Sequence, residues 1–153
     1  MSSFFIGFTS SDAVLRDGDS LLAGRIVIGD FEEEFEASLS HWTRERYETQ
    51  WRDGLRRLVD GVERSCLITS MYDPTTANFI EWWPCYRQGR EIAFQNQILF
   101  MDRLEAPYDP AVPYRFVRPL TLTNAAGQRI STWRTDVQAV RTYLDDTAAL
   151  ASE

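Results

Sequence analysis

The chain has 153 residues, with 23 acidic side chains against 16 basic ones, all of them arginine, and a formal net charge of -7. Since nucleic-acid binding depends on Lys and Arg that neutralise phosphates, this balance argues against direct nucleic-acid binding and favours a basic protein partner. No apolar run approaches the roughly 18 residues of a membrane helix, no basic secretory start is present, and two cysteines are too few for a disulfide framework, so we expect a cytoplasmic protein without a membrane anchor.

Few apolar positions occur between Thr9 and Gly24. Thr9–Gly24 is rich in Ser, Asp and Gly, which predicts a loosely ordered arm or loop over residues 1–24. We expect a single domain over residues 25–147 and a frayed tail over residues 148–153.

A strand pattern begins at Arg25, where apolar residues recur at period two as far as Leu39, with an interruption that predicts a bulge at Gly29. The opposite face of this strand carries three carboxylates, Glu32, Glu34 and Glu36. Like charges on one face repel each other mildly, and a cationic partner would relieve that repulsion. The alternative is a solvated strand face or a sheet edge that charge keeps from aggregating.

Thr43–Val59 forms the clearest helix of the sequence. Its apolar residues recur at helical spacing and define one face: Tyr47, Trp51, Leu55, Leu58 and Val59. Ser40 or Thr43 can cap its start and Gly61 can end it. We expect Trp51 to lie in the core.

Six strand candidates follow the helix: Ser65–Tyr72, Phe79–Tyr86, Glu91–Phe100, Tyr114–Arg118, Leu120–Thr123 and Gln128–Trp133. Short turns at Arg87–Arg90 and Asn124–Gly127 favour antiparallel pairing. Thr135 and Gln138 have the spacing of a capping box at the start of a last helix. The sequence therefore predicts a single α+β domain, with an antiparallel sheet of about five to six strands packed by two helices.

Met71–Phe100 interleaves aromatic rings with amides, charges and a proline, a composition typical of recognition surfaces. Trp82 and Trp83 should point to opposite sides of their strand, so at most one of them is expected in the core. We expect Phe94, Phe100 and Trp133 to be core residues. A small-ligand or adaptor module, with aromatic rings lining a pocket, stays open as an alternative.

An enzyme is the other alternative, and its groups would come from few residues. His41 with Cys85 is a conceivable base and nucleophile, Glu81 with Glu91 a conceivable acid and base, and Cys66 is more typical of a small buried residue. No two His or Cys residues have metal-ligand spacing, and we expect no cofactor, no metal and no catalytic activity.

Several short words in the chain resemble one family. They are G-D-F-E-E-E-F at Gly29–Phe35, W-T-R-E-R-Y-E-T-Q-W at Trp42–Trp51, Y-R-Q-G at Tyr86–Gly89, Q-N-Q at Gln95–Gln97 and G-Q-R-I-S-T-W at Gly127–Trp133. In this order they resemble immunity proteins of bacterial contact-dependent growth inhibition, over roughly Gly29–Leu144. The resemblance implies a small α+β protein without enzymatic activity that binds and blocks the toxic C-terminal domain of a large effector.

Such toxins are often nucleases and therefore basic, whereas this chain is acidic. Attraction between the negative charge of this chain and the positive charge of the toxin would raise their association rate. We expect Glu32, Glu34 and Glu36 to steer association. Desolvated side chains would then hold the complex, and the candidates for this anchoring role are Asp73, Glu81 and Trp82.

Overall fold

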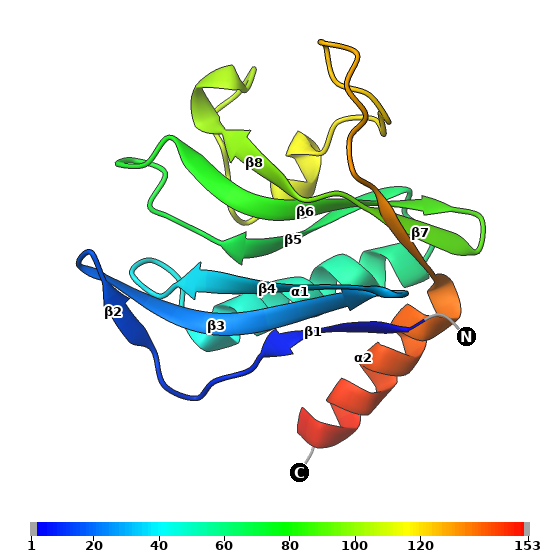
Figure 1. The fold of residues 1–153 in the computed structure, drawn as a ribbon, viewed down its shortest axis with the longest axis horizontal. Helices are drawn as coiled ribbons and strands as arrows, with labels where there is room; N and C mark the ends of the chain where they lie inside the picture. The colour runs from blue at the N-terminus through cyan, green and yellow to red at the C-terminus, as the bar shows by residue number, and fades with distance from the viewer. Residues whose placement is uncertain (1–2, 152–153) are drawn as a thin grey trace.

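The computed structural model describes residues 3–151, which form two antiparallel sheets and two α-helices (Figure 1). The first sheet contains β1 (Phe4–Phe8), β2 (Val14–Arg16), β3 (Asp19–Ile28) and β4 (Phe31–Ser38). β3 is its central strand, with β4 along one edge and β1 and β2 along the other. Burial alternates along β3 and β4, so this sheet has one core face and one outer face.

The second sheet contains β5 (Arg64–Ser70), β6 (Phe79–Gln88), β7 (Glu91–Phe94), β8 (Gln97–Phe100) and β9 (Trp133–Asp136). β6 is central, with β5 along one edge, β8 and β7 along the other, and β9 beyond β7. Gln95 and Asn96 divide the stretch that was predicted as one strand. The α+β class, the antiparallel pairing and the two helices are confirmed, while the strands divide between two sheets.

The prediction of a loose arm over residues 1–24 is wrong where the structure describes them. β1, β2 and the start of β3 lie there, and β1 pairs with β3 from Phe4 to Phe8. The signal that could have indicated this hairpin is Asp17-Gly18, the two-residue turn between β2 and β3, with φ values of 53° and 79°. Asp-Gly is favoured in such turns because both positions require positive φ.

Gly29 is a turn residue and not the predicted bulge. Ile28 pairs with Phe31, so Gly29 and Asp30 form a two-residue loop between β3 and β4, and Gly29 has a φ of 61°. A residue without a Cβ adopts this backbone conformation at little cost. The alternation along β4 is kept, with its glutamates at positions 32, 34 and 36 exposed.

α1 (Arg44–Val59) confirms the predicted helix, and Thr43 is its N-cap, since the Thr43 hydroxyl accepts a hydrogen bond from the amide of Arg46 at 3.2 Å. Trp51, predicted in the core, is 1% exposed. Gly61, with a φ of 101°, follows the helix as predicted.

α1 also covers the free edge of β5, where backbone groups would otherwise lack partners. The Gln50 side chain donates to the carbonyl of Cys66 at 2.8 Å and accepts from the amide of Ile68 at 2.7 Å. The indole of Trp51 donates to the carbonyl of Ile68 at 2.7 Å. Two residues of one helix therefore satisfy three buried backbone groups of the strand.

α2 (Val137–Ala151) begins one residue later than predicted. Asp136 caps it by accepting a hydrogen bond from the amide of Ala139 at 2.7 Å. The predicted cap, Thr135, lies in β9 and donates its hydroxyl to the carbonyl of Ser3 at 2.9 Å. The predicted frayed tail, residues 148–153, overlaps this helix as far as Ala151, and residues 152–153 lie outside the described part of the chain.

Residues 101–132, here called the covering segment, connect β8 to β9 and lie against β6 and β8 (Figure 1). They contain the 3-10 helices η1 (Met101–Arg103) and η2 (Pro113–Phe116). The strands predicted at Tyr114–Arg118 and Leu120–Thr123 are wrong, since Pro113 begins a helical turn and position 123 forms only an isolated bridge. The covering segment is fixed by hydrogen bonds such as that from the Tyr86 hydroxyl to the carbonyl of Arg118 at 2.9 Å.

The core joins both sheets through aromatic contacts. Phe31 stacks on Trp133 with ring centroids 3.9 Å apart, and Trp83 lies 5.7 Å from Trp133. Phe94 is fully buried as predicted, whereas Phe100 and Trp133 are partly buried. Neither helix within residues 3–151 is long and apolar enough to cross a membrane.

Candidate functional site

The outer face of the first sheet carries the three predicted steering carboxylates, here called the acidic strip: Glu32, Glu34 and Glu36. Across β3 the strip faces Val27, Arg25 and Ala23. The Arg25 guanidinium lies 3.5 Å from Glu32, and Arg16 on β2 pairs with Glu36. Glu34 takes part in no ion pair among the described residues. The strip therefore keeps a net negative charge.

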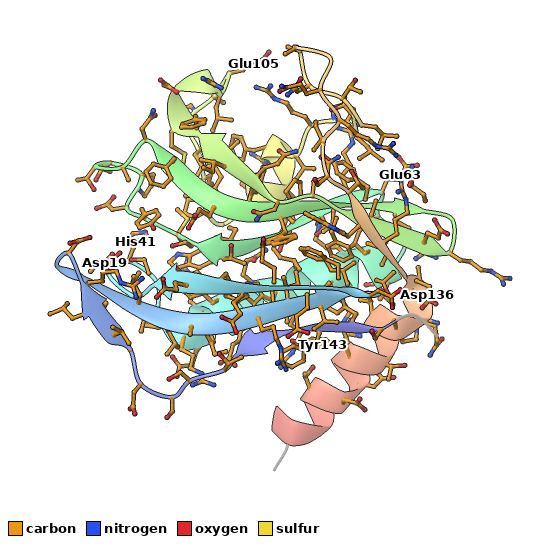
Figure 2. The ribbon with its side chains drawn as sticks, in the orientation of Figure 1. Asp19, His41, Glu63, Glu105, Asp136 and Tyr143 are labelled. Carbon is orange, nitrogen blue, oxygen red and sulfur yellow. The ribbon has the colours of Figure 1, made fainter. Side chains whose placement is uncertain are left out.

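Carboxylates also gather where one end of each sheet meets the other. The hydroxyl of Ser38 on β4 lies 2.8 Å from Asp19 Oδ1, and the amide of Ser38 donates to the hydroxyl of Ser70 on β5 at 3.1 Å. Ser70 in turn pairs in register with Glu81 on β6. Serine contacts between the sheets thus bring Asp19 and Glu81 to one end of the molecule, where Figure 2 also shows His41.

Aromatic side chains accompany these carboxylates. The rings of Tyr72 and Phe79 lie 5.2 Å apart, and Phe79 is 38% exposed. Burial raises the pKa of Tyr72, and the nearby Glu81 and Asp19 charges add to the shift. Burial also raises the pKa of the half-buried Glu81 carboxyl, so its charge is poorly solvated.

Asp73 follows Tyr72 in the loop between β5 and β6. Its Oδ1 accepts hydrogen bonds from the hydroxyl of Thr75 at 2.7 Å and from the amide of Thr75 at 2.9 Å, and these bonds lower the pKa of Asp73, with a smaller effect from His41. Asp73 therefore orders its own loop beside the carboxylates. We call this surface the acidic end: Asp19, Tyr72, Asp73, Phe79 and Glu81.

Trp82, predicted as a partner-binding anchor, does not lie on this surface. It is 2% exposed and is covered by residues that include Phe116 and Pro119 of the covering segment. Trp83 points to the other side of β6, as alternation predicts, and contacts Phe31 and Trp133 in the core. Both tryptophans are buried, because the covering segment takes the place that the prediction left for a partner.

Comparisons with known proteins agree on one family. A model described as the CdiI N-terminal domain matches residues 37–143. The immunity protein CdiI of Enterobacter cloacae subsp. cloacae is 30% identical over 133 residues, which cover 87% of this chain and 91% of that protein. This chain belongs to the CdiI immunity-protein family. A chain of a solved CdiA-CT/CdiI toxin and immunity complex from Enterobacter cloacae matches with a TM-score of 0.85 at 28% identity, covering 95% of this chain and 99% of that chain.

The CdiI family was the one that the sequence resembled, so that prediction is confirmed. Family membership suggests a non-catalytic role. The burial of both cysteines, of which Cys85 was considered as a nucleophile, is consistent with a non-catalytic role. Cys66 and Cys85 are fully buried, and burial raises the pKa of both thiols, whereas His41 is exposed. A buried neutral thiol is a poor nucleophile.

The conceivable acid and base pair, Glu81 and Glu91, is too widely spaced for hydrolysis. Glu91 pairs with Gln88, at the opposite end of β6 from Glu81, so the two backbones are about 23 Å apart at the usual rise per residue. Glycosidase carboxyl pairs are separated by about 5 to 10 Å. In addition, no three His, Cys, Asp or Glu side chains within residues 3–151 gather as metal ligands.

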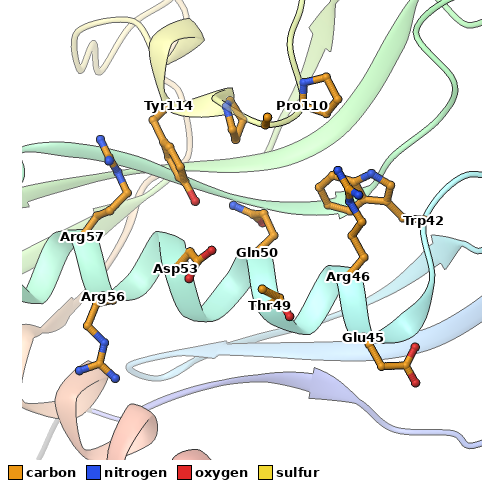
Figure 3. A pocket seen from close by; sticks show the side chains of 12 residues that line it. Trp42, Glu45, Arg46, Thr49, Gln50, Asp53, Arg56, Arg57, Pro110 and Tyr114 are labelled. Carbon is orange, nitrogen blue, oxygen red and sulfur yellow. The ribbon is translucent and has the colours of Figure 1, made fainter.

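A groove of about 670 Å³ lies between α1 and the covering segment (Figure 3). Arg46 stacks over Trp42 at 5.0 Å, and Arg57 stacks over Tyr114 at 4.1 Å. Glu45 and Asp53 also line the groove, so its charge is mixed. Its size is in the range of small-molecule sites, but its lining favours no particular ligand, and the ligand-binding alternative stays a prediction.

Proposed function

We propose that this chain is an immunity protein that binds and neutralises the toxic C-terminal domain of a contact-dependent growth inhibition effector. The observation that carries this proposal is the match, over 95% of the chain, to a chain of a CdiA-CT/CdiI toxin and immunity complex. Neutralisation would be by occlusion, with the toxin held against an acidic, aromatic surface of this protein. The proposed place of action is the cytoplasm.

The distribution of charge supports a basic toxin. Residues 12–36 contain eight carboxylates and two arginines, a difference of -6 within a chain of net charge -7. A toxin that acts on nucleic acid needs a positive surface, and such a surface would be attracted to the acidic strip. The strip would therefore raise the association rate and would contribute less to the lifetime of the complex.

The acidic end has the features of an anchor. Glu81 is half-buried with a raised pKa, so a guanidinium or ammonium group of the toxin would find a carboxylate that is already partly desolvated. Tyr72 and Phe79 supply aromatic surface beside it, as interface anchors commonly do. We propose Glu81, Tyr72 and Phe79 as the anchoring residues, with Asp73 in support and Trp82 left in the core.

Calorimetric titration with a catalytically inactive form of the toxin domain encoded beside this chain tests the function itself. Tight 1:1 binding is expected, and absence of binding would overturn the proposal. The steering role is tested by association kinetics at low salt. Reversal of the acidic strip to lysine should slow association by about tenfold or more, while the dissociation rate changes little.

A matched control has the same change in net charge elsewhere, with lysine at three exposed carboxylates, Glu63, Asp145 and Asp146. If steering is local to the strip, this control should slow association much less. Equal slowing by both variants would assign the effect to net charge alone. The anchoring role is tested separately, because Phe79→Ala and Glu81→Gln should raise the dissociation rate about tenfold or more and leave association nearly unchanged.

A further inference from the structure

The covering segment differs in charge from the first sheet. It contains four arginines and three carboxylates, a balance of +1, in a chain of net charge -7. A cavity of about 220 Å³ lies between this segment and the strands β6 and β8. In Figure 1 this region is at the top of the molecule, away from β2 and β3. None of the residues that line the cavity belongs to the acidic strip or to the acidic end.

The lining of the cavity is cationic. Arg103 and Arg118 contribute to it, and no Asp or Glu is among the lining residues. The Arg103 guanidinium lies over the ring of Phe100 at 4.8 Å, and Arg118 Nη2 donates to the carbonyl of Arg103 at 3.4 Å. Within residues 3–151 neither arginine belongs to an ion pair. Both guanidinium groups therefore have donors left for an anion.

The wall of the cavity that β6 forms contains a buried hydrogen-bond donor that has no acceptor among the described residues. Trp82 lines the cavity, and its indole Nε1 is buried without a hydrogen-bond partner in the described part of the chain. A buried N–H group is stabilised by any acceptor that reaches it. This is the tryptophan that the sequence had indicated as a recognition residue.

The rest of the cavity is held in place by buried amides. Gln95 is 1% exposed; its side-chain Nε2 donates to the carbonyl of Thr121 at 2.8 Å, and its Oε1 accepts from the side-chain Nε2 of Gln97 at 2.8 Å. The bond to Thr121 ties the covering segment to Gln95, which lies between β7 and β8. The polar wall of the cavity is therefore ordered before any ligand enters, which lowers the cost of binding.

We propose that this cavity binds a small anion with a carboxylate or phosphate group, held by Arg103 and Arg118 beside the buried indole of Trp82. The volume lies below the range of about 300 to 1,000 Å³ that is usual for drug-sized ligands, which limits the ligand to the size of inorganic phosphate or a short carboxylic acid. The anionic group can come from a free small molecule or from an acidic side chain of a bound protein. The free-anion form of the proposal does not depend on toxin binding.

The indole signals in a proton–nitrogen NMR correlation spectrum test it, with Trp82 assigned by through-bond experiments. Sodium phosphate and sodium succinate are titrated separately, with sodium chloride at equal ionic strength as control. A free-anion site is expected to shift the Trp82 indole signal saturably, with a dissociation constant on the order of 1 mM for at least one of the two anions. Arg118→Gln should weaken this binding about tenfold.

Arg129→Gln is the matched control, because Arg129 belongs to the covering segment but does not line the cavity. It should leave the dissociation constant unchanged. In the second arm the inactive toxin domain replaces the salts. If the Trp82 signal shifts with the toxin domain but not with the salts, and Arg118→Gln abolishes that shift, the anionic group is a carboxylate of the bound protein. The proposal is overturned if the Trp82 signal does not move in either arm, moves equally with chloride, or moves equally in the Arg118 variant.

Discussion

Gly54→Ala tests the contact between α1 and the free edge of β5. In an exposed helix interior this change stabilises a protein by about 1 kcal/mol, because alanine has the higher helix propensity. Here the added Cβ would lie 2.4 Å from the carbonyl oxygen of Cys66 and 3.2 Å from Leu67 Cδ2. The first contact is with backbone that also accepts the hydrogen bond of Gln50, so it cannot rotate away. The helix must move instead.

The magnitude follows from what that movement weakens. Gln50 makes two hydrogen bonds to β5 and Trp51 makes one. Each contributes about 0.5 to 1.5 kcal/mol, so the loss of two costs about 2 kcal/mol. Overpacking of the core adds about 1 to 3 kcal/mol, and helix propensity returns about 1 kcal/mol. We expect Gly54→Ala to lower the free energy of unfolding by about 3 kcal/mol.

Urea denaturation followed by tryptophan fluorescence and circular dichroism measures this quantity. Thr49→Ala is the control, because Thr49 is exposed on the same helix and gains propensity without a clash. It should raise the free energy of unfolding by about 0.5 kcal/mol. A Gly54→Ala protein as stable as the wild type would refute the claim that α1 lies too close to β5 for a side chain.

Three further outcomes are expected. Tyr47→Phe should lower the free energy of unfolding by about 2 to 4 kcal/mol in the same assay, because the Tyr47 hydroxyl accepts from the buried amide of Met71 at 2.8 Å and also donates to a backbone carbonyl. Glu81→Gln should stabilise the protein at pH 7, because burial raises the folded-state pKa of Glu81 and its charge therefore costs stability above that pKa. The melting temperature of the variant should exceed that of the wild type at pH 7, and this difference should vanish as the pH falls towards 4.5, the ordinary pKa of a glutamate. The thiols of Cys66 and Cys85 should react with an aromatic disulfide reagent only after unfolding, because burial raises the pKa of each thiol, and rapid reaction of the native protein would contradict their burial.

The sequence predicted those helices and strands whose apolar periodicity, caps and terminating residues lie within the element itself. α1 has an apolar face, a capping Thr43 and a terminating Gly61, and it was found where predicted. β2 gave no such signal, because all three of its residues are exposed and no alternation results. Only the Asp17-Gly18 turn could have indicated that the chain reverses there. Short exposed strands depend on their neighbour in the sheet, which a local pattern does not contain.

The geometry of the proposed toxin-binding surface follows from the sequence only in part, for the same reason. The acidic strip follows from alternation along one strand, so its common face was predictable. The acidic end depends on how the two sheets meet, through Ser38 and Ser70, and no spacing in the sequence indicates that Asp19 would join Glu81. Trp82 was misplaced because residues far along the chain cover it.

The stability of the fold does not explain the acidic strip. Its side chains are about 6 to 7 Å apart along β4, and exposed ion pairs such as Arg25 with Glu32 contribute only about 0 to 1 kcal/mol. Glu34 lies opposite Arg25 in register but forms no ion pair among the described residues, so attraction to Arg25 and repulsion from the neighbouring glutamates nearly offset each other. Glu34→Gln should therefore leave the free energy of unfolding nearly unchanged.

The same variant should slow association with a basic toxin domain at low salt and should lose this effect at high salt, where the field of the strip is screened. The association rate would then fall on a substitution that leaves stability nearly unchanged, which a structural role for Glu34 does not predict. If Glu34→Gln instead destabilises the protein and leaves the association rate unchanged, the strip belongs to the fold, and the search for the toxin surface moves to the acidic end alone.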